Sequence, residues 1–240
     1  MGLKDADIYI LGGHQNLNQG YSDRTYSTVF ANMYYNNGMG IHAELLNMNR
    51  EEDSSYIAAG LSYITGNHSI KAIIGTSTDN DGILPELLIR GEISYKTSPE
   101  IGFVFTPSVT HRRYRNTAEE VSLDTNATKY FSVGYGKSLI LQAFGRVVFS
   151  TPGNKTSPSG GIDFTFSEHK KYSMGLTFEG GKSSYSSVLD LSEIGLSYYS
   201  VRPHVGIFLN KNMELTISGE YTDLNDYEIL GGNAGIKYHF

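Results

Sequence analysis

The last ten residues, GGNAGIKYHF at positions 231–240, carry the pattern that decides the fold class. From Ala234 to Phe240 every second residue is apolar, and the residues between them are small or polar. Because successive side chains of a β-strand point to opposite faces, this period of two predicts a strand with one apolar and one polar face. The chain therefore ends on a strand whose final residue is aromatic.

The same alternation recurs along the whole chain, for example in residues 87–96, 103–110 and 213–221. Short turns are predicted near 36–38, 66–67, 98–99, 136–137, 168–170 and 210–212. Longer polar connections are predicted near 14–22, 49–54, 78–85, 115–126, 150–160, 180–196 and 222–230. Strands placed between them number about fourteen, with both chain ends on the short-turn side. Within 187–209 the alternation changes phase, which we interpret as a bulge or a long loop.

Composition supports strands and excludes several kinds of protein. Only 18% of residues are charged and 39% are apolar, whereas 27 Gly and 18 Tyr suit strands and turns. The net charge of −6 has no basic block, which argues against nucleic acid as a partner. The absence of Cys excludes disulfides, thiolate catalysis and Cys-ligated metals. No stretch approaches about 18 consecutive apolar residues, so any membrane crossing is by strands.

The size of the predicted sheet indicates which face lies inside. A barrel of about fourteen strands is too wide for side chains to fill as a core. Its apolar face must then point outward into lipid. The sequence therefore predicts an all-β fold, a closed antiparallel up-and-down transmembrane β-barrel of about 14 strands, within a range of about 12 to 16. Two soluble β-sandwiches with their apolar faces buried inward are the alternative.

Tyrosines cluster near the short turns, as expected of an aromatic girdle at a membrane interface. The alternative for each of them is that tyrosine is simply a favoured strand residue. The predicted girdle residues are Tyr35, Tyr63, Tyr95, Tyr135, Tyr172 and Tyr238.

Strand parity also predicts which ionisable side chains face the lumen. Both signs are present in similar number, which suits either a polar passage for sugars or a lumen closed by ion pairs. Two inward aromatic residues, Tyr130 and Phe144, could stack on sugar rings or simply fill the lumen. The predicted ionisable lumen residues are His42, Glu44, Lys71, Arg90, Glu92, Lys96, Arg112, Arg146, Asp163, Glu179, Arg202, His204, Glu214, Glu220 and Lys237.

Several segments resemble the YaiO-like outer-membrane barrel domain. They are ILPE at 83–86, RGEISY at 90–95, HRRYR at 111–115, TPG at 151–153, the serines and glycine of 157–160, and the ending at 231–240. The resemblance implies a bacterial outer-membrane β-barrel linked to surface or exopolysaccharide systems, and it supplies no catalytic residues. The absence of Trp departs from that family. An aromatic ending also resembles the last strand that the barrel-assembly machinery reads, which makes Tyr238 and Phe240 the predicted assembly signal.

These observations lead to three functional hypotheses. The first is a single outer-membrane barrel domain over residues 1–240, without signal peptide or N-terminal domain, that acts as a porin-like passive passage or membrane platform for exopolysaccharide export. The second is a lipid- or glycan-modifying outer-membrane enzyme that uses His14, His111 or His204. The third is a closed-barrel anchor or receptor that binds through its outer loops.

We expect no enzymatic activity, because no spacing in the sequence assembles a nucleophile, a base and an orienting acid. No cofactor and no metal site is expected either. The expected partners are outer-membrane lipid, the barrel-assembly machinery and a surface polysaccharide.

Overall fold

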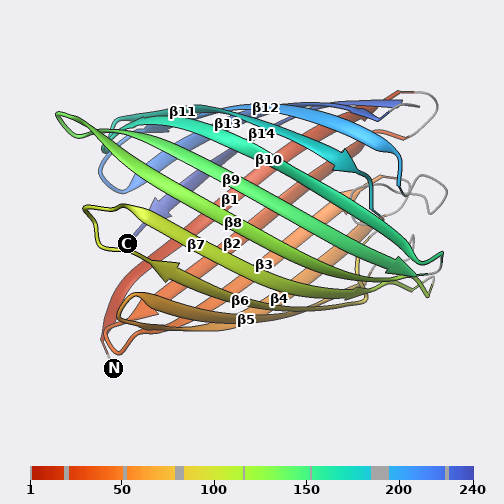
Figure 1. The fold of residues 1–240 in the computed structure, drawn as a ribbon, viewed down its shortest axis with the longest axis horizontal. Coiled ribbons are helices and arrows are strands. Elements are labelled where there is room, and N and C mark those ends of the chain that lie inside the picture. The colour runs from red at the N-terminus through yellow and green to blue at the C-terminus, as the bar shows by residue number, and fades with distance from the viewer. Residues whose placement is uncertain are drawn as a thin grey trace.

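The computed structural model describes residues 2–18, 22–50, 53–78, 84–115, 117–151, 153–184, 195–224 and 227–240. Each strand pairs antiparallel with its neighbour in sequence, and β1 pairs with β14 to close the ring (Figure 1). The predicted closed antiparallel barrel of fourteen strands is confirmed. Its strands are β1 (Leu3–Leu17), β2 (Arg24–Tyr35), β3 (Met39–Asn49), β4 (Asp53–Thr65), β5 (His68–Ser77), β6 (Leu87–Lys96), β7 (Phe103–Arg113), β8 (Glu119–Gly134), β9 (Lys137–Thr151), β10 (Lys155–Glu168), β11 (Tyr172–Lys182), β12 (Ser197–Phe208), β13 (Met213–Leu224) and β14 (Tyr227–His239).

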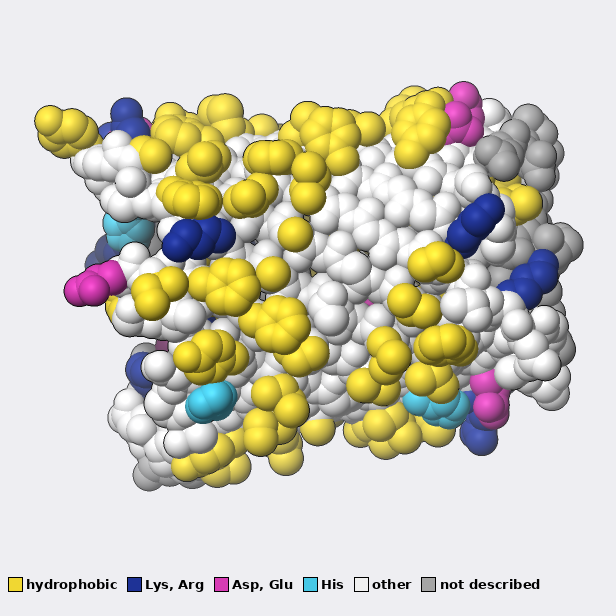
Figure 2. Space-filling view, viewed as in Figure 1, with side chains coloured by type: hydrophobic (Ala, Val, Ile, Leu, Met, Phe, Trp, Pro, Cys, Tyr) yellow, Lys and Arg dark blue, Asp and Glu magenta, His cyan; other side chains and the backbone are white. Residues whose placement is uncertain are grey.

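The apolar face of the strands points outward and the polar face points into the lumen. Ile57, Leu61 and Ile70 are each 58% exposed, whereas the polar side chains of Ser122 and Ser150 are 0% and 2% exposed. Figure 2 shows hydrophobic side chains spread over the visible outer wall, with most charged side chains toward its two ends. This distribution is the reverse of a soluble domain, and the alternative of two soluble sandwiches is wrong.

Both chain ends lie at the end of the barrel where the six shortest predicted turns lie (Figure 1). We call this the turn end and the opposite one the loop end. The seam runs from Asp7 opposite His239 to Leu17 opposite Ile229. The last residue continues it, because the backbone N–H of Phe240 donates to the carbonyl of Ala6 at 2.9 Å. Closure therefore satisfies the backbone at both edges of the sheet, as a membrane interior requires.

Several loop-end connections are shorter than the sequence predicted. Strand β8 begins at Glu119, inside the predicted connection 115–126, and β9 and β10 are separated by only residues 152–154. Strands β13 and β14 are separated by only residues 225–226. The prediction was wrong there because the lumen faces of these strands are as polar as loops, for example Glu120, Ser122 and Asp124.

The stretch that changes phase, residues 187–209, gives one strand, β12, and residues 187–194 of the predicted bulge or loop lie outside the described residues. Within the described ranges no helix is long and apolar enough to cross a membrane.

Candidate functional site

The lumen contains a cavity of about 470 Å³ in its loop-end half, which we call the loop-end cavity. Residues of ten strands, β2 and β6 to β14, line it, so it reaches most of the inner wall. Seven residues predicted to face the lumen lie in its lining. They are Arg90, Arg112, Phe144, Arg146, Glu179, Arg202 and Glu220.

Ion pairs connect neighbouring strands around this cavity. Arg146 of β9 pairs with Asp124 of β8, and Arg202 of β12 pairs with Glu179 of β11. Arg146 lies directly opposite Asp124 in the ladder of β8 and β9, and Arg202 lies two residues along β12 from the partner of Glu179. Both ion pairs therefore run along the wall and link adjacent strands. Arg90 pairs with Glu92 two residues along β6, at 2.8 Å.

A second cavity of about 750 Å³, the turn-end cavity, lies in the other half of the lumen. Its lining includes the predicted residues Glu92, Lys96, His42 and Lys71. His42 is fixed from both ring nitrogens, with Asn32 Oδ1 at 2.7 Å from Nδ1 and Ser62 Oγ at 2.9 Å from Nε2. A histidine held on both sides in this way is a structural link between strands.

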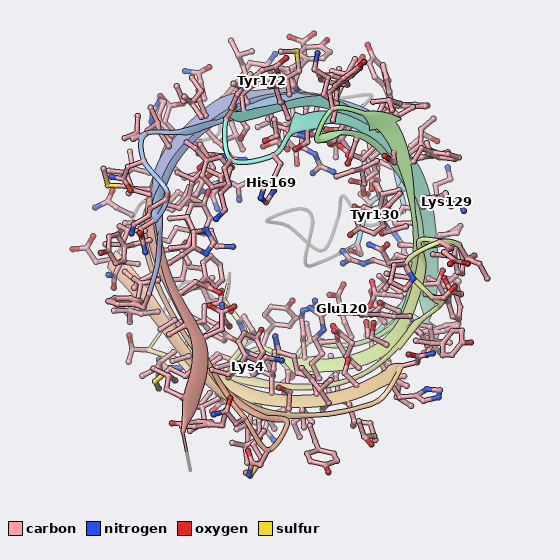
Figure 3. All side chains as sticks on the ribbon, turned by 90° about the vertical axis from the view of Figure 1, so that its left-hand side faces the viewer. Lys4, Glu120, Lys129, Tyr130, His169 and Tyr172 are labelled. Atoms are coloured by element: carbon pink, nitrogen blue, oxygen red, sulfur yellow. The ribbon has the colours of Figure 1, made fainter. Side chains whose placement is uncertain are left out.

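The remaining predicted lumen residues lie outside these two cavities. Glu214 and Lys237 face each other across β13 and β14, on the side opposite the exposed Ile236 and Tyr238. Figure 3, a view from the turn end, shows Tyr130 and Glu120 on the inner side of the wall and Lys129 on its outer side.

The predicted girdle tyrosines all lie toward the turn end, and their role stays a prediction. Tyr135 is fully exposed in the turn between β8 and β9, whereas Tyr63, Tyr95 and Tyr238 are 41% to 51% exposed on the outer wall. The ring of Tyr238 meets that of Phe240 edge to face, with 4.8 Å between centroids. Tyr35 ends β2 and Tyr172 begins β11, so both also lie at this level.

The sequence missed three ionisable residues of the loop-end cavity: Arg24, Asp124 and Tyr198. Asp124 fell inside a predicted loop, and Arg24 and Tyr198 lie next to predicted loops. The alternation pattern could have predicted two of them, since Arg24 has the same parity as the inward residues of β2 and Asp124 the same parity as Asn126. This requires that the alternation be extended into the polar ends of the strands.

An apolar cluster crosses the mouth of the barrel at the loop end. Tyr114 and Ala118, in the loop between β7 and β8, are 2% and 1% exposed, and they pack with residues of β1, β13 and β14. Those strands lie across the ring from β7 and β8, so the loop folds over the lumen. We call this cluster the apolar cap. Its members are Leu17, Tyr114, Ala118, Leu224, Tyr227 and Ile229.

A second inward apolar cluster lies at the loop end. Leu84, from the connection before β6, is 8% exposed and packs in a cluster with Tyr56 and Ala58 of β4. Side chains from two loop-end connections therefore narrow the mouth on the inside of the wall.

The histidines named for the enzyme hypothesis lie far apart in the fold. The Nε2 atom of His14 lies 3.8 Å from a carboxylate oxygen of Asp23, and that of His111 lies 3.9 Å from a carboxylate oxygen of Glu119. Of the three histidines, His204 is the one that approaches both a carboxylate and a hydroxyl group. The hydroxyl of Thr165 lies 2.7 Å from Asp163 and 3.0 Å from His204 Nε2. A carboxylate only accepts, so this hydroxyl donates to Asp163, and Nε2 must donate to its oxygen. His204 therefore presents no base to Thr165.

Among the described residues, no group of three or more His, Asp or Glu side chains is arranged to hold a metal ion.

Comparisons with solved structures support the fold. The outer membrane protein Omp33 of Acinetobacter baumannii aligns over 98% of this chain and 99% of its own, with 14% identity and a TM-score of 0.59. A bacterial polysaccharide outer membrane secretin aligns over 98% of each chain, with 7% identity and a TM-score of 0.62. The KdgM porin, in complex with disordered oligogalacturonate, covers 97% of this chain and 99% of its own, with 14% identity and a TM-score of 0.51. No protein-family model and no curated protein matches the sequence.

This chain is an outer-membrane β-barrel. The closed ring, the outward apolar wall and the shared architecture together confirm the predicted bacterial outer-membrane location. The likeness to known structures lies in the fold, and the YaiO-like resemblance is not among the matches.

Proposed function

We propose that this outer-membrane barrel is a passive passage for small polar solutes. The observation that carries the proposal is the polar lumen lining that runs from the loop-end cavity to the turn-end cavity. Such a lining favours a hydrated path, because buried charges and hydroxyls require water or other polar partners. A porin and a polysaccharide secretin among the structures of the same architecture support this proposal.

The apolar cap makes the proposed passage narrow at the loop end. Tyr114 is almost completely buried in it, and the cap shares Leu224 and Ile229 with the lining of the loop-end cavity. The cap therefore lies directly over that cavity. We expect small conductance steps and slow diffusion of large sugars, since both depend on the narrowest cross-section.

A link to exopolysaccharide export is the finer form of the proposal. It rests on the YaiO-like resemblance and on the polysaccharide secretin of similar fold. Lipid of the outer membrane and the barrel-assembly machinery are the proposed partners, because the outward apolar wall must be inserted into a bilayer. We propose a transport role and not an enzymatic one, since His204 offers no base to its neighbouring hydroxyl.

The test is a recording from purified protein in planar bilayers, together with swelling of liposomes in neutral sugars. The proposal expects discrete conductance steps and swelling that slows from monosaccharide to trisaccharide. Liposomes without protein and liposomes with boiled protein are the controls. A complete lack of conductance and swelling, with the barrel shown to be folded, would rule out the passage.

A closed-barrel anchor or receptor is the second candidate, and the apolar cap is the observation that favours it. A cap that never opens would leave the loop end as a binding surface on a sealed barrel. The same recordings discriminate between the candidates, because a sealed barrel conducts nothing. If removal of cap contacts at Tyr114 restored conductance, the sealed state of the natural chain would be established.

A further inference from the structure

More cationic than anionic side chains line the loop-end cavity, although the chain carries a net charge of −6. Five arginines and three carboxylates are among the described residues that line it. The chain as a whole has 25 acidic against 19 basic residues, so the excess in this cavity is opposite in sign. The arginines are Arg24, Arg90, Arg112, Arg146 and Arg202.

The three carboxylates of the cavity are already bound by the protein. Asp124 pairs with Arg146 and accepts from the Ser122 hydroxyl at 2.9 Å. Glu179 pairs with Arg202 and accepts from the Tyr198 hydroxyl. The third, Glu220, accepts from Gln15 Nε2 at 2.6 Å and from Thr222 at 3.3 Å. These interactions use much of the accepting capacity of the acids.

Three arginines keep donors to spare. Among the described residues, Arg24 and Arg112 have no carboxylate within 4.0 Å, and Arg90 pairs with Glu92 through Nη2 alone. The charge of Glu220 attracts Arg24, while the nearby Arg50 repels it. Within the described ranges, Arg112 donates one long hydrogen bond, 3.4 Å, to the Ser122 hydroxyl. Its cross-strand neighbour Glu120 accepts instead from Ser150 and Tyr114.

The rest of the lining suits a sugar ring. Phe144 enters the cavity from β9, and its ring lies over Gly161 of β10, where an added Cβ would come within 2.6 Å of ring atom Cζ. The hydroxyls of Thr110, Ser200 and Thr222 line the same space. A flat aromatic ring packs against the apolar C–H face of a sugar, and hydroxyl side chains form hydrogen bonds with the hydroxyl groups of the sugar.

We propose that the loop-end cavity is a binding site for anionic saccharides that carry carboxylate groups. The spare guanidinium donors of Arg24, Arg90 and Arg112 bind the carboxylate, and Phe144 and the hydroxyls bind the ring. Guanidinium groups match the planar geometry of carboxylates and form charge-assisted hydrogen bonds with them. The site deepens the passage proposed above and rests on it, because the saccharide is the solute in transit.

The apolar cap strengthens such a site. Leu224 and Ile229 belong both to the cap and to the cavity lining, so they reduce contact between the arginines and bulk water. Charge interactions grow stronger as the local dielectric constant falls. The cavity volume of about 470 Å³ also lies within the usual range of small-molecule sites.

Titration calorimetry of the protein in detergent provides the test. Three probes are compared: a uronate disaccharide, its neutral counterpart and inorganic phosphate. We expect the uronate to bind at least about 10-fold more tightly than either of the others, since loss of a charge-assisted contact costs about a factor of ten or more. A neutral sugar that binds as tightly would overturn the proposal, and so would phosphate of equal affinity, which would indicate an anion site without sugar recognition.

Arg112→Gln and Arg113→Gln form a matched pair of variants. Arg113 is next in sequence but lies on the outer face of β7, where it pairs with Glu86 at 3.5 Å. We expect R112Q to lose about 10-fold or more in uronate affinity and R113Q to bind as the natural protein does. Equal loss in both variants, or no loss in R112Q, contradicts the proposal. Heat-dependent gel migration first verifies that each barrel is folded, and Arg24→Gln serves as a second variant if R112Q fails to fold.

Phe144→Leu tests the saccharide half of the proposal. We expect it to weaken uronate binding and to leave phosphate binding unchanged, because only the ring contact is lost. Bilayer recordings separate the two proposals: conductance without uronate preference removes the site and keeps the passage, whereas uronate binding without conductance removes the passage and keeps the site.

Discussion

Ile217 and Ser218 are neighbours in β13 that face two different environments. Ile217 is 51% exposed on the outer wall, whereas Ser218 lies on the inner face among polar residues of the lumen. This contrast follows from the period of two, which alternates each strand between lipid and lumen. The cost of a charge at these two positions should therefore differ greatly.

We predict that Ile217→Arg destabilises the barrel in lipid by about 2–4 kcal/mol, the cost of an arginine near the bilayer midplane on a lipid-facing wall. Ser218→Arg should cost much less, because its side chain enters a polar lumen. Denaturant titration of both variants refolded into vesicles measures the difference. Equal destabilisation would mean that the two faces are assigned the wrong way round.

The loop between β7 and β8 is the element that carries the apolar cap into the mouth of the barrel. Its hairpin is closed by a backbone hydrogen bond of 2.9 Å from Tyr114 to Ala118, and it places Tyr114 against the opposite wall. The strands around it fix the width of the lumen, and among the described residues this loop brings buried apolar side chains against the opposite wall. The cap can therefore change without any change in the barrel wall.

We predict that Tyr114→Ala increases single-channel conductance several-fold, because the cap loses a buried ring and the passage widens. The loss of this ring should also lower the free energy of unfolding by about 3 kcal/mol. Tyr199→Ala is the matched control, since Tyr199 is 51% exposed on the outer wall at the same end. Bilayer recordings compare the two variants. An unchanged conductance in Y114A, with a folded barrel, would show that the cap is not the narrowest point.

At the scale of the whole molecule, closure between β1 and β14 leaves no free sheet edge. Every strand is hydrogen-bonded on both sides, so the wall opens only when whole strands separate. Closed barrels of this kind combine a rigid wall with an exterior that lipid or detergent must cover.

We predict that the unheated protein migrates faster than boiled protein on a detergent gel, because the closed barrel stays compact until heat separates its strands. A sample refolded after boiling should regain the fast band. Identical migration of heated and unheated samples would count heavily against a closed barrel.

Local alternation was enough to predict the strand pattern, the number of strands and the direction of each face. These follow from local alternation and from the fact that a wide ring cannot be filled by side chains. The inward positions of Arg90, Arg112, Arg146 and Phe144 could be predicted in the same way, from parity alone.

The interactions among those inward side chains, in contrast, depend on the folded barrel. Parity places Arg112 and Arg146 in the lumen, but ion pairing across strands decides that Arg146 is neutralised by Asp124 while Arg112 keeps its donors. The apolar cap was equally beyond the sequence, since Tyr114 and Leu224 lie on opposite sides of the ring and meet only because a loop folds inward. The alternation along each strand is a local property, whereas contacts across the lumen depend on closure of the whole ring.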